Sequence, residues 1–248
     1  MSRAYPAAVA ILLAFAVPSV FARAQDPAPT AAPASASVSV AKPQVTFAFE
    51  RVGLPVPKYR LIIQEDGSTV YEGEAVPQGD NSRYAPVVSP AQPFRSAVRI
   101  SPATAAHILS MGRKLNHFNI MCASKAKNIA DTGTKILSYA APDGSGSCTY
   151  NFTENKDIES LTETFLGITE TMDRGRELDH LHRFDRLGLD AAITFLTQEV
   201  SEGHALELGT IAVSLRSIAG DPEVIERARA RATKLLALIP GEVQQAGP

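Results

Sequence analysis

The chain lacks tryptophan and is poor in aromatic residues and cysteine. Phe and Tyr make up 6% of its 248 residues, which argues against a carbohydrate-binding platform built from stacked rings. Only two cysteines are present. After the N-terminal leader described below, no apolar run approaches the ~18 residues of a membrane-spanning helix. We therefore expect no integral membrane segment in the processed chain.

The chain also lacks an excess of either charge. Lys and Arg number 24, and Asp and Glu number 26. Loss of Arg3 and Arg23 with the leader leaves 22 basic and 26 acidic residues, a formal charge of −4. This balance provides no broad positive field, so we expect no nucleic-acid partner.

Motifs of known chemistry are missing as well. The sequence has no G-x-S-x-G nucleophile elbow, P-loop, H-E-x-x-H zinc motif or dinucleotide fingerprint. Gly144-Ser145-Gly146 resembles a nucleophile turn, but it lies in an expected hairpin turn and not between a strand and a helix. We expect no cofactor, assign no catalytic residue and regard an enzyme as the less favoured class.

The first 24 residues are typical of a cleavable secretory signal peptide. Arg3 supplies a positive charge, residues 7–17 form an apolar core, and Ala22-Arg23-Ala24 is a small-x-small cleavage site. We expect a mature chain that starts at Gln25 and works in the periplasm or outside the cell. An uncleaved anchor is the alternative, but the apolar run is shorter than a membrane span.

The two cysteines, Cys122 and Cys148, fit neither a zinc motif nor a C-x-x-C redox pair. Because exported proteins meet an oxidising environment, we expect them to form one disulfide. The loop that the disulfide closes would contribute roughly 3–4 kcal/mol in the chain-entropy model.

Residues 25–44 are rich in Ala, Pro and Ser and carry almost no charge, so we expect a disordered linker. The next residues, 45–50, alternate between apolar and polar side chains, as in a half-buried strand. Further strands are expected at 59–64, 69–72, 96–100, 134–140 and 148–153. The turns at 65–68 and 142–146 contain Asp-Gly and join their flanking strands into hairpins.

Helix signals dominate elsewhere. Ser101 and Pro102 are an N-cap and a first-turn proline, and they begin a helix whose apolar stripe includes Ala105, Ile108, Leu109 and Leu115. A second stripe starts near Asp157 and comprises Ile158, Leu161, Phe165, Ile168 and Met172. Three shorter helices are expected near 190–201, 205–219 and 222–238. Residues 116–131 fit neither period clearly, and helix in part of them is one interpretation.

These elements predict an α+β fold. An antiparallel sheet with two hairpins, packed by a helix, occupies 45–154, and a C-terminal helical block occupies 155–240. Residues 241–248 form a flexible tail. The helix from Asp157 belongs either to the core of the sheet domain or to an independent domain, and the sequence leaves both alternatives open.

The first hairpin follows a recognisable pattern. Its residues are Pro57-Lys58-Tyr59-Arg60-Leu61-Ile62-Ile63, then Gly67, then Val70-Tyr71-Glu72-Gly73. They resemble the P-x-Y-x-(aliphatic)…G-x-x-(aliphatic)-Y-x-G pattern of bacterial exported domains of unknown function. Members of that group carry a Cys upstream of the proline, where this chain has Leu54-Pro55-Val56. The resemblance covers a short part of the chain and implies export without a known activity.

Asp179, His180, His182 and Asp185 form the one concentration of metal-type ligands in the sequence. On a helix the two histidines point about 200° apart and cannot chelate one ion together. A site would require the helix to end near Leu178. We favour a solvated helix end and assign no metal, and His180, His182 and Asp185 are the candidates if one binds.

The other histidines, His107, His117 and His204, are isolated in the sequence, and we expect surface or packing roles for them. Three arginines of the last helix, Arg227, Arg229 and Arg231, are spread around the helix and form no basic stripe. Glu223 and Glu226 lie at spacings that predict ion pairs with these arginines.

The favoured hypothesis is therefore a non-enzymatic binding or structural module of the cell envelope, whose partner is another envelope protein. The missing catalytic motifs, the linker and hairpin edges that can accept a strand support it. The alternative is an exported hydrolase or metal-binding enzyme. That alternative requires a pocket that collects several of Asp179, His180, His182, Asp185 and His117.

Overall fold

A computed structural model describes residues 42–76 and 90–240 of the chain. The expected signal peptide, most of the linker and the C-terminal tail lie outside these residues. Residues 42–44 belong to the folded part, contrary to the linker boundary that we predicted. Lys42 Nζ lies 2.9 Å from the Asp66 carboxylate, the Glu65 amide donates to the Pro43 carbonyl, and the first strand begins at Gln44.

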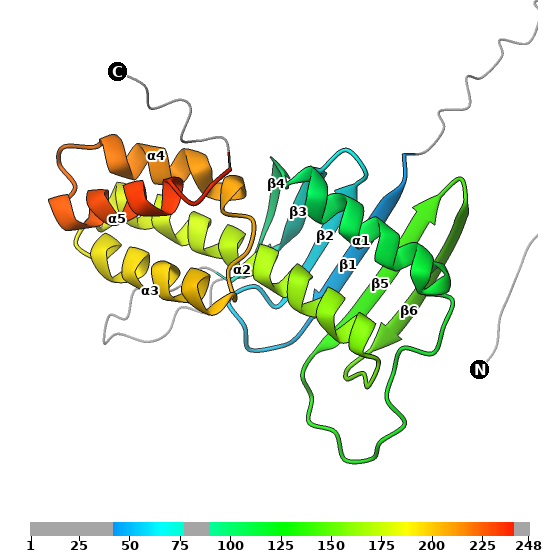
Figure 1. Cartoon of the computed structure of the whole chain (residues 1–248). Coiled ribbons are helices and arrows are strands. Elements are labelled where there is room, and N and C mark those ends of the chain that lie inside the picture. Colours follow the sequence, from blue (N-terminus) through cyan, green and yellow to red (C-terminus); the bar gives the residue numbers. More distant parts are fainter. Residues whose placement is uncertain (1–41, 77–89, 241–248) are drawn as a thin grey trace, which may run out of the picture. The chain divides into compact units, whose positions relative to one another are not determined.

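Six antiparallel strands form one sheet in the order β4-β3-β2-β1-β5-β6 (Figure 1). The strands are β1 (Gln44–Glu50), β2 (Lys58–Gln64), β3 (Ser68–Ala75), β4 (Gln92–Arg99), β5 (Thr134–Ala141) and β6 (Gly144–Tyr150). Alternate residues of β1, β2 and β5 are buried, as their period of two predicts. The α+β class is confirmed.

Two helices lie across the buried face of the sheet (Figure 1). Helix α1 (Pro102–Lys114) begins where predicted, because the Ser101 hydroxyl accepts a hydrogen bond from the Thr104 amide. Helix α2 (Lys156–Phe184) has 29 residues, and the Asn155 side chain caps it by accepting from two backbone amides. The expected apolar stripe of α2 is buried against the sheet.

The second hairpin differs from the prediction. Its turn contains only Pro142 and Asp143, because Gly144 already pairs with Ala141. The strand expected at 148–153 also ends earlier, because β6 stops at Tyr150, and Phe152 beyond it is 43% exposed.

The ambiguous stretch after α1 contains an unusual turn. Asn116, His117 and Phe118 have φ values of 52°, 56° and 64°, so η1 (Asn116–Phe118) is left-handed. This conformation is costly for residues with a Cβ atom. The turn packs on β6 at two glycines of that strand, Gly144 and Gly146. A Cβ atom on Gly146 would lie 2.3 Å from the His117 carbonyl oxygen.

Cys122 and Cys148 form the expected disulfide, with Cα atoms 5.9 Å apart. It joins the irregular segment that follows η1 to strand β6. Within residues 42–76 and 90–240, no helix has the length and apolar content to cross a membrane.

The C-terminal block contains α3 (Leu189–Glu202), α4 (Ala212–Gly220) and α5 (Glu226–Leu236). Helices α4 and α5 both begin later in the chain than predicted. The short turn η2 (Leu208–Ile211) precedes α4, and the helix start expected near residue 222 is instead a turn that begins at Asp221. There the Asp221 carboxylate accepts from the Glu223 amide, and α5 begins at Glu226.

Helix α2 contributes to two hydrophobic clusters. Its residues from Ile158 to Met172 pack in the sheet cluster, whereas Leu178 packs in the cluster of α3, α4 and α5. The helix therefore belongs to the core of the sheet part and continues into the helical block. All described residues belong to one compact unit.

The Glu207 side chain connects the helical block to the sheet part through hydrogen bonds. The Glu207 carboxylate accepts hydrogen bonds from the Ser101 amide at 2.7 Å and from the Ser101 hydroxyl at 2.8 Å. It also accepts from the Thr104 hydroxyl. An anionic group at a helix N-terminus is stabilised by the unpaired amides and the helix dipole, so Glu207 acts as a second cap of α1.

We predict that Gly146→Ala lowers the free energy of unfolding by about 2 kcal/mol, because the new methyl group meets the backbone of η1. Gly220→Ala is the matched control. A Cβ atom there meets nothing within 4 Å, and the change is expected to be neutral or stabilising. Urea denaturation measures both, and equal stability of the two variants would contradict the packing of η1 on β6.

Candidate functional site

A groove of about 1390 Å³ runs along one side of α2. It is lined by α2 residues from Glu159 to His180, which at 1.5 Å per residue corresponds to about 30 Å of helix. Pockets for small molecules usually measure 300–1,000 Å³. The size of the groove therefore suits a polymer segment better than a compact metabolite.

The two sides of the groove differ in chemistry. The sheet side contains apolar residues of β1 and β2 and of the segments that follow β1, β3 and β6, including Leu54, Val76 and Phe152. The opposite side consists of α2 and the end of α3. The chain after α3 crosses α2 at Gly167, whose carbonyl accepts from the Leu206 amide at 3.1 Å. A Cβ atom on Gly167 would lie 2.8 Å from the Leu206 side chain, so the crossing requires glycine.

Asp173 is a partly buried carboxylate on the groove wall, with 31% of its side chain exposed. The Tyr71 hydroxyl donates to it at 2.9 Å, and the Arg176 guanidinium lies 3.3 Å away. Burial raises the pKa of Asp173 to about 6, against the lowering effects of Arg176 and Tyr71. Its charge therefore changes near pH 6.

Two tyrosines of the sheet, Tyr59 of β2 and Tyr71 of β3, contact helix α2 at this wall. The Tyr59 hydroxyl lies 3.3 Å from the Thr169 hydroxyl, and its ring contacts that of Tyr71 edge-on. Burial raises the pKa of Tyr59 and of Tyr71 well above the usual range. Both phenols stay neutral, so they act as hydrogen-bonding groups and not as nucleophiles.

Two of the basic residues that line the groove, Arg174 and Lys135, are held by other groups. Arg174 Nε lies 2.7 Å from the Glu170 carboxylate, and a second nitrogen lies 2.6 Å from Glu177. Lys135 is 7% exposed and donates to backbone carbonyls, including that of Asn151 at 2.9 Å. Burial, its largest influence, lowers the pKa of Lys135.

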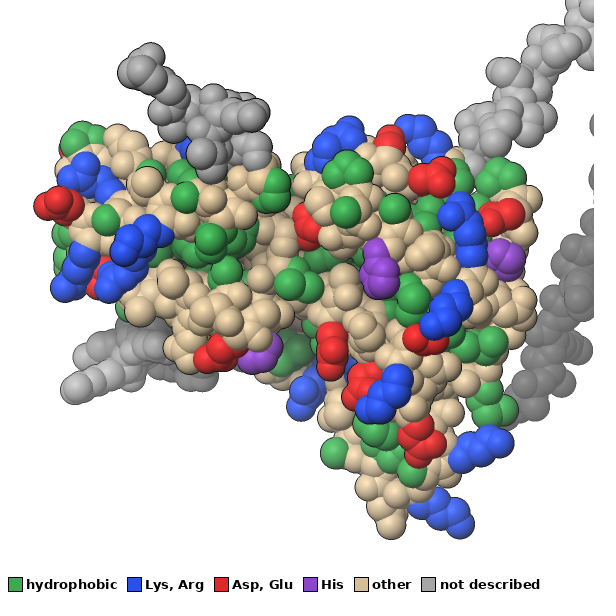
Figure 2. Space-filling model, in the orientation of Figure 1, with side chains coloured by type: hydrophobic (Ala, Val, Ile, Leu, Met, Phe, Trp, Pro, Cys, Tyr) green, Lys and Arg blue, Asp and Glu red, His purple; other side chains and the backbone are tan. Residues whose placement is uncertain are grey.

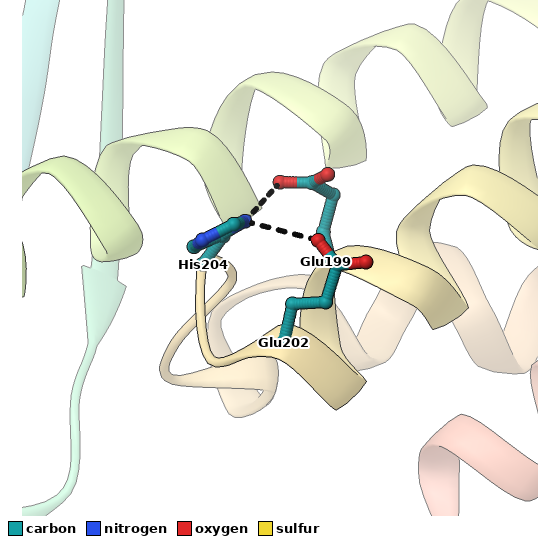
Figure 3. Close-up of side chains that lie close together, drawn as sticks. All are labelled: Glu199, Glu202 and His204. Atoms are coloured by element: carbon teal, nitrogen blue, oxygen red, sulfur yellow. Dashed lines mark ion pairs between the residues drawn. The ribbon is translucent and has the colours of Figure 1, made fainter.

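At the α3 end of the groove, Glu199, Glu202 and His204 converge (Figure 3). His204 Nδ1 lies 3.4 Å from a carboxylate oxygen of each glutamate. Among the described residues, this is the one group of three such side chains that lies close enough to hold a metal ion. In this triad, one imidazole nitrogen lies close to two carboxylates.

The end of α3 explains this convergence. Gly203 is left-handed, with φ of 78°, and the His204 amide donates to the Glu199 carbonyl at 2.8 Å. In such a Schellman ending, the residue after the glycine contacts the residue five positions earlier, usually through apolar side chains. Here the two positions carry His204 and Glu199. A helix followed by Gly-His, with Glu five residues before the His, is a signal that sequence reasoning missed.

The structure does not bring the predicted metal candidates together. Helix α2 continues to Phe184 instead of ending near Leu178, so His180 and His182 lie on different faces. His180 lines the groove with its ring against Phe184, while His182 Nε2 lies 2.8 Å from the Asp221 carboxylate. Asp185 accepts from the Gly188 amide, and Asp179 is exposed.

The isolated histidines have separate places. His107 is exposed on α1, and the His117 ring packs against Tyr139 with centroids 4.8 Å apart. His204, which we expected to be isolated, is part of the triad. Of the residues that the hydrolase hypothesis required, only His180 lines the groove.

The basic residues of α5 make different pairs from those predicted. Arg227 and Arg231 both contact Asp190 of α3, and Glu223 contacts Arg186. Glu223 lies before α5, so it does not have the helical spacing that the prediction assumed. Basic and acidic side chains are interspersed on the face of the molecule in Figure 2.

No protein-family model matches the chain, and no curated protein matches it. The functional argument therefore depends on the groove itself.

We predict that Asp173 titrates near pH 6 and that its protonation stabilises the fold. Because the folded pKa is raised above 3.8, this contribution is complete below about pH 4 and is lost as the pH rises through 6. The wild type should lose on the order of 2 kcal/mol relative to Asp173→Asn between pH 4 and 7. Urea denaturation at several pH values measures the difference.

Tyr71→Phe serves as the control for the cause of this shift. Removing the hydroxyl that donates to Asp173 should raise the Asp173 pKa further, as followed by NMR titration of the side-chain carboxyl. An Asp173 that titrates near pH 4 in the wild type would contradict the assignment.

Proposed function

We propose that the protein is an exported, non-enzymatic binding module of the cell envelope, and that the groove along α2 receives a segment of another envelope polypeptide. The observation that carries the proposal is the groove, which follows α2 for about 30 Å and exceeds the usual volume of a small-molecule pocket. A polymer segment matches that length.

The chemistry of the groove supports binding over catalysis. An activated nucleophile requires a base within hydrogen-bond reach and a pKa suited to the reaction. The phenols of Tyr59 and Tyr71 are held neutral, and Asp173 is already engaged by Tyr71 and Arg176. These polar groups fix one another and present a defined surface.

Three observations support the envelope as the location. The first is the N-terminal leader, with its positive residue, apolar core and small-x-small site. The second is the disulfide between Cys122 and Cys148, a bond typical of oxidising compartments. The third is the resemblance of the first hairpin to exported domains.

Site-specific photocrosslinking tests the proposed binding site. Leu166 lines the groove and is 36% exposed, so a photoreactive amino acid at this position faces a bound segment. Irradiation of cells that produce the protein should give a discrete adduct with one exported polypeptide. The control is Thr149, an exposed residue of β6 that does not line the groove. Adducts of equal yield from both positions, or none from Leu166, would refute the groove as the binding site.

Intact-mass measurement tests the location. Protein from the exported fraction should begin at Gln25 and weigh two hydrogens less than the reduced mature chain, because the leader is removed and the two thiols are oxidised. A chain that keeps its first residues and two free thiols would place it outside the oxidising compartment and exclude the envelope role.

A further inference from the structure

We infer that the segment entering the groove is cationic and amphipathic, an extended stretch of polypeptide in which Lys or Arg alternates with apolar residues. This inference rests on the proposed function and adds the chemistry of the partner. It follows from the net charge of the groove, the place where that charge gathers, and the contrast between the two walls.

Carboxylates outnumber basic side chains in the groove. Seven carboxylates and four Lys or Arg side chains line it. The carboxylates are Glu159, Glu163, Glu170, Asp173, Glu177, Glu199 and Glu202. The lining side chains therefore sum to three negative formal charges before any histidine is protonated, and Lys156, outside the lining, pairs with one of these carboxylates, Glu159.

Most of the positive charge in the groove is already engaged. Arg174 is shared by Glu170 and Glu177, and the Arg176 guanidinium lies 3.9 Å from the centre of the Phe94 ring while it pairs with Asp173. Lys135 is buried, and its ammonium group donates hydrogen bonds to the backbone carbonyls of Gly133 and Asn151. Arg51, which is exposed, is the fourth basic side chain that lines the groove.

The remaining negative charge gathers where the chain crosses α2. Glu163 lies one turn before Gly167, and a Cβ atom on Gly167 would come within 3.1 Å of the His204 carbonyl oxygen. Glu199 and Glu202 lie beside His204 at the C-terminal end of α3. The dipole of α3 adds negative potential there, and no basic residue occupies the last turn of this helix.

The sheet side of the groove, opposite the acidic wall, carries exposed apolar side chains. Val76 is 39% exposed and Phe152 is 43% exposed, and both line the groove. In an extended chain, successive side chains point to opposite sides. Cationic residues can therefore face the acidic wall while the alternate apolar residues face the sheet side. At about 3.3 Å per residue, roughly nine residues fill 30 Å.

Fluorescence anisotropy with two labelled decapeptides at nanomolar concentration tests the inference on the full mature chain. One peptide alternates Lys and Leu, and the other alternates Glu and Leu. The Lys-Leu peptide should bind at least tenfold more tightly than the Glu-Leu peptide, and added salt should weaken its binding because screening reduces the attraction between charges.

A matched pair of double variants separates the groove from general charge attraction. Glu163→Gln with Glu202→Gln removes two groove carboxylates, whereas Glu74→Gln with Glu226→Gln removes two exposed carboxylates that do not line the groove. Both double variants change the net charge equally. We expect the groove variant to weaken binding of the Lys-Leu peptide at least fivefold and the control variant less than twofold.

Equal weakening by the two double variants, equal binding of the two peptides, or no binding of the Lys-Leu peptide would overturn the inference. If Leu166 still crosslinks to a partner in those cases, the binding function stands and the charge of the segment is wrong. If Leu166 gives no adduct, the proposed function itself fails.

Discussion

The length of α2 is the constraint on which the rest of the structure depends. At 29 residues it measures about 44 Å, whereas six strands spaced about 4.8 Å apart span roughly 24 Å. The helix extends beyond the sheet, and its apolar residues there need a second cover. Helices α3, α4 and α5 provide it. The groove lies along the same helix, between the edge of the sheet part and the end of α3.

Local signals in the sequence predicted most of the elements. The alternation from Val45, the Asp-Gly turn at residues 66–67, the Ser101 cap and the stripe from Ile158 each depend on neighbours within a few residues. Such features can be read from one chain because their energetics are local. The disulfide was predictable for a different reason, since two cysteines allow only one intramolecular pairing.

The remaining features depend on contacts between distant residues. The left-handed turn at His117 is tolerated because glycines of β6, such as Gly146, leave room for it. Asp173 occupies an ordinary polar position on helix α2, and only its contact with Tyr71 of strand β3 reveals the partly buried carboxylate. The predicted metal candidates failed to converge because α2 did not stop at Leu178, where the sequence offers no glycine or proline to end it.

The bond between Glu207 and the start of α1 has an evolutionary consequence. An aspartate at position 207 is one methylene shorter, so its carboxylate would fall out of reach of the Ser101 amide, now 2.7 Å away. Replacing Ser101 alone would leave the glutamate without one of its donors. We therefore expect the two positions to covary among descendants of this sequence, although 106 residues separate them.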